Sequence, residues 1–310
     1  MGWAMEIADR RATQAEPYSL SGYGNSVEVS GRYMDVMTDE HFLRLSQFIQ
    51  DLCGIKLPYA KKSMLEGRLR KRLRALSFDS FEDYCKYLFS PKGTETEYVH
   101  MIDVVTTNKT DFFREPAHFE YLSIKAIPEL LSKGLAGARR GLNVWSAACS
   151  TGEEPYTLAM VLSEFAERCA GFRFSILATD ISTHVLQKAN SATYDSDRVD
   201  PIPMTLRRKY LLRSKNKEKG LVRIAPELRE LVRFQRLNLM DEDYGIREPM
   251  GIVFCRNVLI YFDRETQERI LNRLARQLVS GGFLFVGHSE SLLGLDLPLV
   301  QSVPTVYRKL

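Results

Sequence analysis

The residues best suited to chemistry stand where short apolar runs give way to polar side chains. One such point is a run of small residues, 146–152, which lets the backbone approach a ligand closely and leads into Glu153 and Glu154. It lacks the G-x-G-x-x-G spacing of a dinucleotide-binding turn and the Lys-Ser/Thr pair of a P-loop. Two acidic residues there would repel a pyrophosphate by charge, so the pattern favours a cationic ligand over NAD or ATP.

Polar side chains also follow three other apolar runs of the chain. Asp180 follows an apolar run, a position from which a carboxylate accepts hydrogen bonds from ribose hydroxyls. A cap for the helix that starts at Ser182 is an equally good role for a lone aspartate. Asn238 also ends an apolar run, and its amide could read an adenine edge through a paired donor and acceptor. The last point is the string FCRNVLIYF, residues 254–262.

These points require elements that bring them together. From residue 142 onward, short apolar runs alternate with helical patterns, which predicts βαβ units, a mostly parallel sheet and helices on both faces. The expected strands are 142–147, 174–179, 232–238, 251–255, 283–287 and 305–308, with helices over 158–169, 185–191 and 266–278. Because ligands bind at the carboxyl ends of parallel strands, the four points fit one nucleoside-bearing ligand in one crevice.

Other parts of the chain have different patterns. Residues 192–231 interrupt the alternation, and 221–224 after a turn-like segment predicts a small hairpin inserted between two sheet units. Residues 1–37 are polar without a sustained period, so we expect a flexible N-terminal extension. Residues 38–107 predict an all-helical domain, beginning at a cap on Thr38 and containing stripes of apolar residues at helical spacing. The remainder, 108–310, forms the predicted sheet domain.

Composition limits the protein class. The chain has 310 residues, 45% of them hydrophobic and 26% charged, which indicates about two globular domains and excludes wholesale disorder. A net charge of +4 is too mild to imply a nucleic-acid partner. The five cysteines are scattered, and no stretch has the length of a spanning helix, so we expect a cytoplasmic protein without membrane insertion.

One helix concentrates positive charge. Between Lys56 and Leu76 there are eight basic residues and one acidic residue, Glu66, while leucines occupy the side that packs inward. Exposed helix faces normally mix signs, so a stripe of one sign predicts an anionic partner. The candidates for contact with that partner are Arg68, Lys71 and Arg74.

Four strings resemble the bacterial chemotaxis receptor methyltransferase family, the CheR-type enzymes. They are VVTTNKTDFFRE at 104–115, VWSAACSTGEEPY at 144–156, FCRNVLIYF at 254–262 and GHSES at 287–291. The resemblance implies an α/β class I (Rossmann-like) methyltransferase sheet with a small inserted antiparallel β-subdomain, plus an all-helical N-terminal domain. It also implies a protein-glutamate O-methyltransferase that uses S-adenosylmethionine, releases S-adenosylhomocysteine and needs no metal.

The resemblance also places the family's site residues on this chain. The implied cofactor-binding residues are Asn108, Thr110, Arg114, Glu154, Asp180, Asn238, Leu239, Arg256 and Asn257. The implied partners are methyl-accepting chemotaxis receptors, through their acidic methylation helices and, in some members, a C-terminal peptide added as a strand to the inserted subdomain. Residues 220–224 are our candidate edge for such a peptide, and we expect a monomer.

Methyl transfer to a glutamate needs no general base, because a carboxyl with a pKa near 4.3 is ionised at neutral pH. Positioning should therefore dominate, and Arg114 and Tyr261 are the candidate catalytic residues that would hold the acceptor carboxylate. Without the resemblance, an ion pair of Arg114 with Glu115 or Glu154 would be the simpler expectation. Cys149 is expected to be a small buried side chain rather than a nucleophile.

Two other function classes remain open from the sequence. A nucleic-acid methyltransferase would use the basic helix to grip phosphates, although 254–262 lacks the Asn/Asp-Pro-Pro-aromatic motif of enzymes that methylate base amino groups. A non-catalytic module that only binds S-adenosylmethionine is the other alternative. The presence of Arg114, Asn257 and Tyr261 favours an active enzyme over this module.

Overall fold

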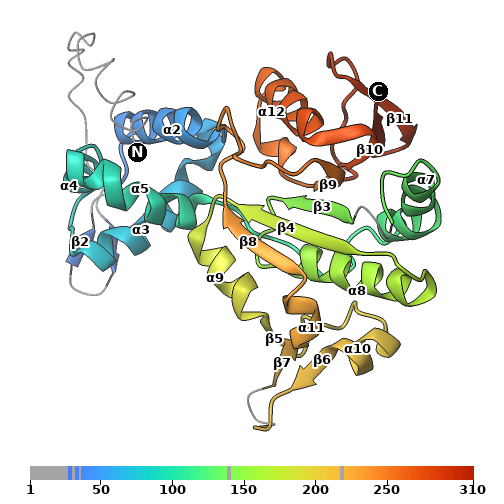
Figure 1. Ribbon diagram of the computed structural model, residues 1–310. Helices are drawn as coiled ribbons and strands as arrows, with labels where there is room; N and C mark the ends of the chain where they lie inside the picture. Colours follow the sequence, from blue (N-terminus) through green and yellow to red (C-terminus); the bar gives the residue numbers. More distant parts are fainter. Residues whose placement is uncertain (1–26, 30–31, 35, 138–140, 217–219) are drawn as a thin grey trace. The chain divides into compact units, whose positions relative to one another are not determined.

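The computed structural model describes residues 27–29, 32–34, 36–137, 141–216 and 220–310 (Figure 1). The chain divides into two compact units, residues 1–107 and 108–310. Most of the extension expected over 1–37 lies outside the described residues. The described part of this segment contains two short strands, β1 (Val27–Val29) and β2 (Arg32–Met34), which pair antiparallel. These strands were not predicted from the sequence, because the residues show no sustained alternation of apolar and polar side chains.

The first unit continues as helices. These are α2 (Asp39–Cys53), the 3₁₀ turn η1 (Tyr59–Lys61), α3 (Lys62–Leu76), α4 (Phe81–Leu88) and α5 (Pro91–Val105). Helix α2 begins where the Thr38 side chain accepts a hydrogen bond from the amide of His41. It ends at Gly54, whose φ of 73° is a left-handed conformation that glycine adopts without strain.

The second unit is built on a seven-stranded sheet in the order β11-β12-β10-β9-β3-β4-β8. The strands are β3 (Leu142–Ala147), β4 (Phe174–Asp180), β8 (Val232–Arg236), β9 (Met250–Cys255), β10 (Leu278–Phe285), β11 (Leu299–Val303) and β12 (Val306–Lys309). Strands β8, β4, β3, β9 and β10 run parallel, whereas β12 pairs antiparallel with β10, and β11 pairs antiparallel with β12.

Helices cover the sheet. They are α6 (Ala117–Tyr121), the π-helical turn η2 (Leu122–Ala126), α7 (Ile127–Ser132), α8 (Glu153–Arg168), α9 (Thr183–Ser191) and α12 (Arg264–Gln277). In Figure 1, α8 and α12 lie on opposite faces of the sheet. The sequence prediction of a mostly parallel sheet with helices on both faces is therefore confirmed.

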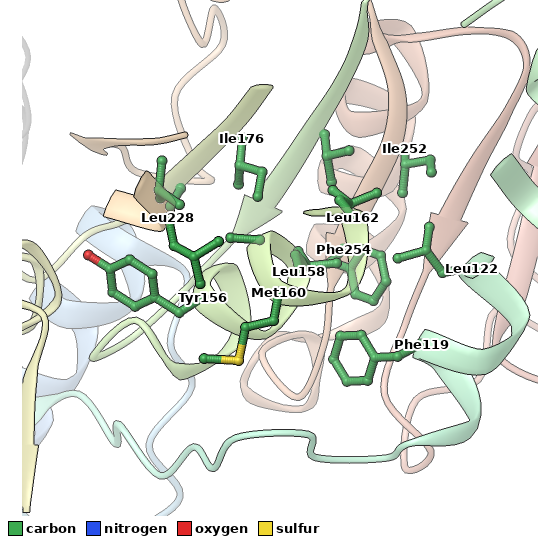
Figure 2. Close-up of a cluster of buried hydrophobic side chains, with 14 of the residues drawn as sticks. Phe119, Leu122, Tyr156, Leu158, Met160, Leu162, Ile176, Leu228, Ile252 and Phe254 are labelled. Atoms are coloured by element: carbon green, nitrogen blue, oxygen red, sulfur yellow. The ribbon is translucent and has the colours of Figure 1, made fainter. Parts of the chain in front are cut away.

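Alternation along the strands fills both faces. Ile252 and Phe254 of β9 belong to one buried cluster, in which Leu158 and Leu162 of α8 also lie (Figure 2). Val253, between them, is buried but is not part of this cluster. Because successive strand side chains point to opposite faces, a fully buried strand requires a helix layer on each side.

The insertion between α9 and β8 forms a separate small sheet. It contains β5 (Thr193–Asp195), α10 (Met204–Tyr210), β6 (Leu211–Arg213), β7 (Leu221–Ile224) and α11 (Pro226–Arg229), with the antiparallel strand order β5-β7-β6. The predicted hairpin is thus a three-stranded sheet. The candidate edge at 220–224 is wrong, because β7 is the central strand and is paired on both sides.

One strand that the sequence did not predict and two element boundaries also differ from the prediction. Strand β11 has no sequence counterpart because three of its five residues are exposed, which leaves no apolar alternation. Helix α8 begins at Glu153 rather than near 158, since both acidic residues belong to its first turn. Strand β10 begins at Leu278, directly after α12, where the apolar pattern of the helix hides the change from helix to strand.

Among the described residues, no helix is both long enough and apolar enough to span a membrane.

Candidate active site

The carboxyl ends of four strands lie side by side in the order β9, β3, β4, β8. From β3 the chain moves outward through β4 to β8, and β9 then returns to the other side of β3. This reversal of strand order is where open α/β sheets bind ligands. The polar points predicted from the sequence therefore meet along one edge of the sheet.

Asp180, the last residue of β4, organises the loop after β3. One carboxylate oxygen accepts the amide of Ser150 at 2.9 Å and the other accepts the amide of Ser182 at 3.0 Å. The cap of α9 is formed by the Ser182 hydroxyl, which accepts the amide of Val185. The helix cap is therefore Ser182 and not Asp180. Asp180 is 7% exposed, and these two hydrogen bonds fix the orientation of its carboxylate between the loop after β3 and the loop after β4.

The acidic pair at the start of α8 is buried and internally partnered. Glu153 is fully buried, 2.8 Å from the guanidinium of Arg198, and it accepts the Thr151 hydroxyl at 2.6 Å. Glu154 accepts the Ser146 hydroxyl at 2.7 Å and pairs with Arg256 at 2.6 Å. The expectation that this pair attracts a cationic ligand is weakened, because each carboxylate already faces a guanidinium.

Arg256, directly after β9, is the centre of a buried polar cluster. Its side chain is 2% exposed, with Nε donating to Glu154 and Nη1 donating to the carbonyl of Arg114 at 2.8 Å. The same Nη1 lies 3.0 Å from Nδ1 of His118 and 3.5 Å from Glu115. Arg256 thus joins the loop after β9 to α8 and to the segment that precedes α6.

The tautomer of His118 follows from these contacts. A guanidinium can only donate, so Nδ1 of His118 must accept, and Nε2–H donates to the Thr305 hydroxyl at 2.7 Å. Burial, followed by the charge of Arg256, lowers the pKa of His118 to about 4. Burial alone would raise the pKa of Glu115, but Arg256 and hydrogen bonds from His288 and Asn257 bring it below the usual value.

Glu115, His118 and His288 each place one potential ligand atom within 4.8 Å of the other two. The arrangement resembles a metal-binding set only superficially. Nδ1 of His118 and the carboxylate of Glu115 already face Arg256, so a metal ion would meet a fixed positive charge.

The segment 108–114 lies against the loop after β3 through its main chain. The Ser150 hydroxyl donates to the carbonyl of Asn108 at 3.0 Å, and Arg198 donates to the carbonyl of Thr110 at 2.8 Å. The guanidinium of Arg114 donates to the carbonyl of Lys109. The simple ion pair of Arg114 with Glu115 or Glu154 is not the arrangement found, because both of these carboxylates face Arg256 instead.

The loops after β8 and β9 supply the remaining predicted residues. The Asn238 side-chain oxygen accepts the amide of Met240 at 3.1 Å, and the Leu239 carbonyl accepts the Tyr244 hydroxyl at 3.0 Å. Asn257 has a left-handed φ of 59° and its side chain donates to Glu115 at 3.3 Å. Tyr261 ends the 3₁₀ turn η4 (Leu259–Tyr261) and is half-buried.

Cys149, in the loop after β3, is 2% exposed. Burial raises the pKa of its thiol well above the usual value, and the carboxylates of Asp180 and Glu154 add to this effect. A thiol that stays protonated is a poor nucleophile, which agrees with the expected structural role.

The basic helix α3, in the first unit, is less exposed than the sequence suggested. Arg68 donates to the carbonyls of Val105 and Thr106 and to the Thr107 hydroxyl, so it caps the end of α5. Arg72 makes two hydrogen bonds of 2.8 Å with Glu97, which is 1% exposed.

Two basic residues of α3 therefore help to hold the first unit together and do not belong to a free charged face. Partly buried cations require partners, and α5 provides them for Arg68 and Arg72. Arg70 and Lys62 also have carboxylate partners, Glu66 and Asp39. Lys71 and Arg74 remain exposed, as predicted.

Comparisons with known proteins agree with this geometry. Residues 108–305 match the family described as "CheR methyltransferase, SAM binding domain", and residues 40–106 match "CheR methyltransferase, all-alpha domain". The chain belongs to the CheR methyltransferase family. The resemblance stated from the four sequence strings is confirmed, and this CheR-family chain is an S-adenosylmethionine-dependent methyltransferase.

Curated relatives support the assignment over most of the chain. A chemotaxis protein methyltransferase of Borreliella burgdorferi is 37% identical over 274 residues, covering 88% of this chain and 95% of that protein. The Salmonella typhimurium protein of the same name is 39% identical, with 87% and 90% covered. Among solved structures, the plantazolicin methyltransferase BpumL in complex with SAH aligns with 55% of this chain and 45% of the BpumL chain. The sequence identity is 10% and the TM-score is 0.30, so the family assignment comes from the sequence comparisons alone.

The residues fit S-adenosylmethionine by the chemistry of their donor set. A fixed carboxylate, Asp180, suits a ribose diol, and the amide of Asn238 stands at the neighbouring strand end. The loop after β3 is made of small residues around Ser150, a composition that suits close approach of a ligand to the main chain.

Sequence reasoning missed several residues that shape the CheR site. Glu115, His118, Arg198 and Glu290 all contact loops that carry predicted site residues. Glu115 and Glu290 do stand within the quoted strings FFRE and GHSES, which was the available signal. Arg198 and His118 had none, since their roles depend on partners brought together by the fold.

Proposed function

We propose that this CheR-family enzyme transfers the methyl group of S-adenosylmethionine to glutamate side chains of methyl-accepting chemotaxis receptors, forming methyl esters. The observation that carries the proposal is the match to curated chemotaxis protein methyltransferases over nearly nine tenths of the chain. By the same kinship, we propose that the enzyme works in the cytoplasm.

The bound donor would supply an electrophilic methyl group on a sulfonium, and the chain's residues would do the positioning. We propose that Asp180, Asn238 and Asn257 bind the donor, together with the other residues that the family pattern implies: Asn108, Thr110, Arg114, Glu154, Leu239 and Arg256. For Arg256 and Glu154, burial and mutual pairing support an indirect role, in which they fix the loops around the donor.

The acceptor carboxylate would be oriented by Arg114 and Tyr261. Arg114 belongs to the segment 108–114, which Arg256 binds through the Arg114 carbonyl. Tyr261 belongs to the loop that starts at Arg256. Since the acceptor is already an anion, transfer needs alignment of its oxygen with the methyl group and exclusion of water rather than a base.

Receptor recognition would involve two further surfaces. Lys71 and Arg74, the exposed cations of α3, suit the acidic methylation helices, whereas Arg68 is occupied by the end of α5. A receptor C-terminal peptide that adds a strand to the small sheet would pair with β5 or β6, the two outer strands.

The test compares labelled methyl transfer from S-adenosylmethionine to receptor protein and to RNA, followed by mild alkali. Label on the receptor that is released as methanol supports a glutamate ester, because only carboxyl esters are readily hydrolysed in this way. Stable label on RNA would support the nucleic-acid alternative, and no transfer with intact donor binding would support a non-catalytic module.

A further inference from the structure

Glu290 is a buried carboxylate in the loop between β10 and β11. It is 7% exposed, and its oxygens accept three main-chain N–H groups: Gly287 at 2.6 Å, Asn257 at 2.8 Å and Leu259 at 2.7 Å. Burial raises the pKa of Glu290, while the same N–H donors act in the opposite direction. The carboxylate is thus surrounded by backbone amides, an arrangement that favours an anion.

The three donors belong to two different strand ends. Gly287 follows β10, whereas Asn257 and Leu259 belong to the loop after β9, and these strands are parallel neighbours. Glu290 therefore ties the two loops together at the carboxyl edge of the sheet. Its hydrogen bond to the amide of Asn257 also holds that residue in a left-handed conformation, which few residues other than glycine and asparagine adopt.

The two loops also interlock sterically. A Cβ atom placed on Gly287 would lie 2.4 Å from Nδ2 of Asn257 and 2.9 Å from its backbone nitrogen. Such distances are far inside van der Waals contact, so only glycine permits the approach. Two independent contacts therefore hold Asn257 in place: the close packing of Gly287 and the hydrogen bond of its amide to Glu290.

We propose that Glu290 is a positioning residue for methyl transfer: it sets the loop 256–261 so that Asn257 and Tyr261 stand in their working positions. Glu290 acts through the backbone and not on a ligand. The assignment rests on the proposed function only for the roles of Asn257 and Tyr261 themselves.

The test uses Glu290→Gln in the full chain. Glutamine keeps the shape but has one oxygen, so its NH2 group must face at least one of the three N–H donors. With saturating donor and receptor, kcat should fall by about 100-fold, the effect of displacing a group by about 1 Å. Glu290→Asp should recover part of the loss, and Glu227→Gln, an exposed position in α11, should match the parent.

Amide hydrogen exchange supplies a readout that does not depend on the acceptor. The amides of residues 257, 259 and 287 should exchange at least about tenfold faster in Glu290→Gln, with β3 unchanged, as local opening without global unfolding requires. A folded Glu290→Gln protein with parental kcat would overturn the proposal, because a positioning role in methyl transfer requires kcat to change. Parental protection at the three amides would overturn it as well.

Two further outcomes have defined meanings. If Glu290→Gln does not fold, Glu290→Asp and Gly287→Ala decide, and parental kcat in both overturns the proposal. If the parent itself does not methylate receptor, the proposed function fails, and unchanged exchange at residues 257, 259 and 287 is then what would overturn the role of Glu290.

Discussion

Replacing Arg256 with methionine should strongly destabilise the second unit even in the absence of any ligand. The side chain is 2% exposed and pairs with Glu154, which is 10% exposed, and Glu115, which is 11% exposed. Methionine fills a similar volume but leaves both carboxylates without their cation. Breaking a buried ion pair from one side costs about 3–5 kcal/mol. For a unit of this size, that corresponds to a fall in melting temperature of about 10 °C.

The assay is thermal and urea unfolding of the parent, Arg256→Met and Arg213→Met, the last being an exposed arginine in β6. Adding Glu154→Gln to Arg256→Met should recover part of the loss, because it removes one of the buried charges left behind. If Arg256→Met melts within about 2 °C of the parent, the buried network is not what Arg256 contributes. A direct contact with the donor would then be the better explanation.

Three other expectations follow from the contacts. Asp180→Ala should weaken binding of S-adenosylhomocysteine by about 1–3 kcal/mol in calorimetry, the value of a buried charged hydrogen bond; unchanged affinity in a folded variant removes Asp180 from the site. The double variant Lys71→Ala, Arg74→Ala should methylate receptor more slowly, and its rate should depend less on salt, while its melting temperature stays near the parent's. Arg68→Ala should instead lower the melting temperature, because α5 loses its cap. Parental methylation of receptor by the double variant at low salt would contradict the first part. The pKa of His118 is about 4 in the folded protein and about 6.5 in the unfolded chain, so the free energy of unfolding should fall by up to about 3 kcal/mol as the pH drops from about 6.5 to about 4. The stability of His118→Asn should lack this dependence on pH. Identical profiles of stability against pH for variant and parent would refute the expectation.

The meeting of the strand ends at one edge was predictable from the sequence because most of the parallel strands are short apolar runs followed by a polar residue. Asp180 and Asn238 could be placed by that pattern alone, since parallel strands bring their carboxyl ends to one edge. Strand β11 could not, because an exposed edge strand carries no apolar alternation. The central position of β7 was equally hidden, since strand order in a small sheet depends on pairing and not on the strand's own residues.

The polar network around the site was the least predictable part. Arg256 and Glu154 are 102 positions apart in the chain, and only the adjacency of β9 and β3 brings them within 2.6 Å. Glu290 and Asn257 meet for the same reason, across β9 and β10. Arg68 was misjudged because a count of charges along a helix does not show that a neighbouring helix ends beside one of them.

The most direct measurement is to locate the transferred methyl group on a receptor by tandem mass spectrometry after reaction with S-adenosylmethionine. We expect the methyl group on glutamate side chains of the receptor's acidic helices, and we expect alkali to remove it. Methyl groups found on lysine, on a main-chain nitrogen or on added RNA, with glutamates unmodified, would contradict the assignment of this enzyme as a protein-glutamate methyltransferase.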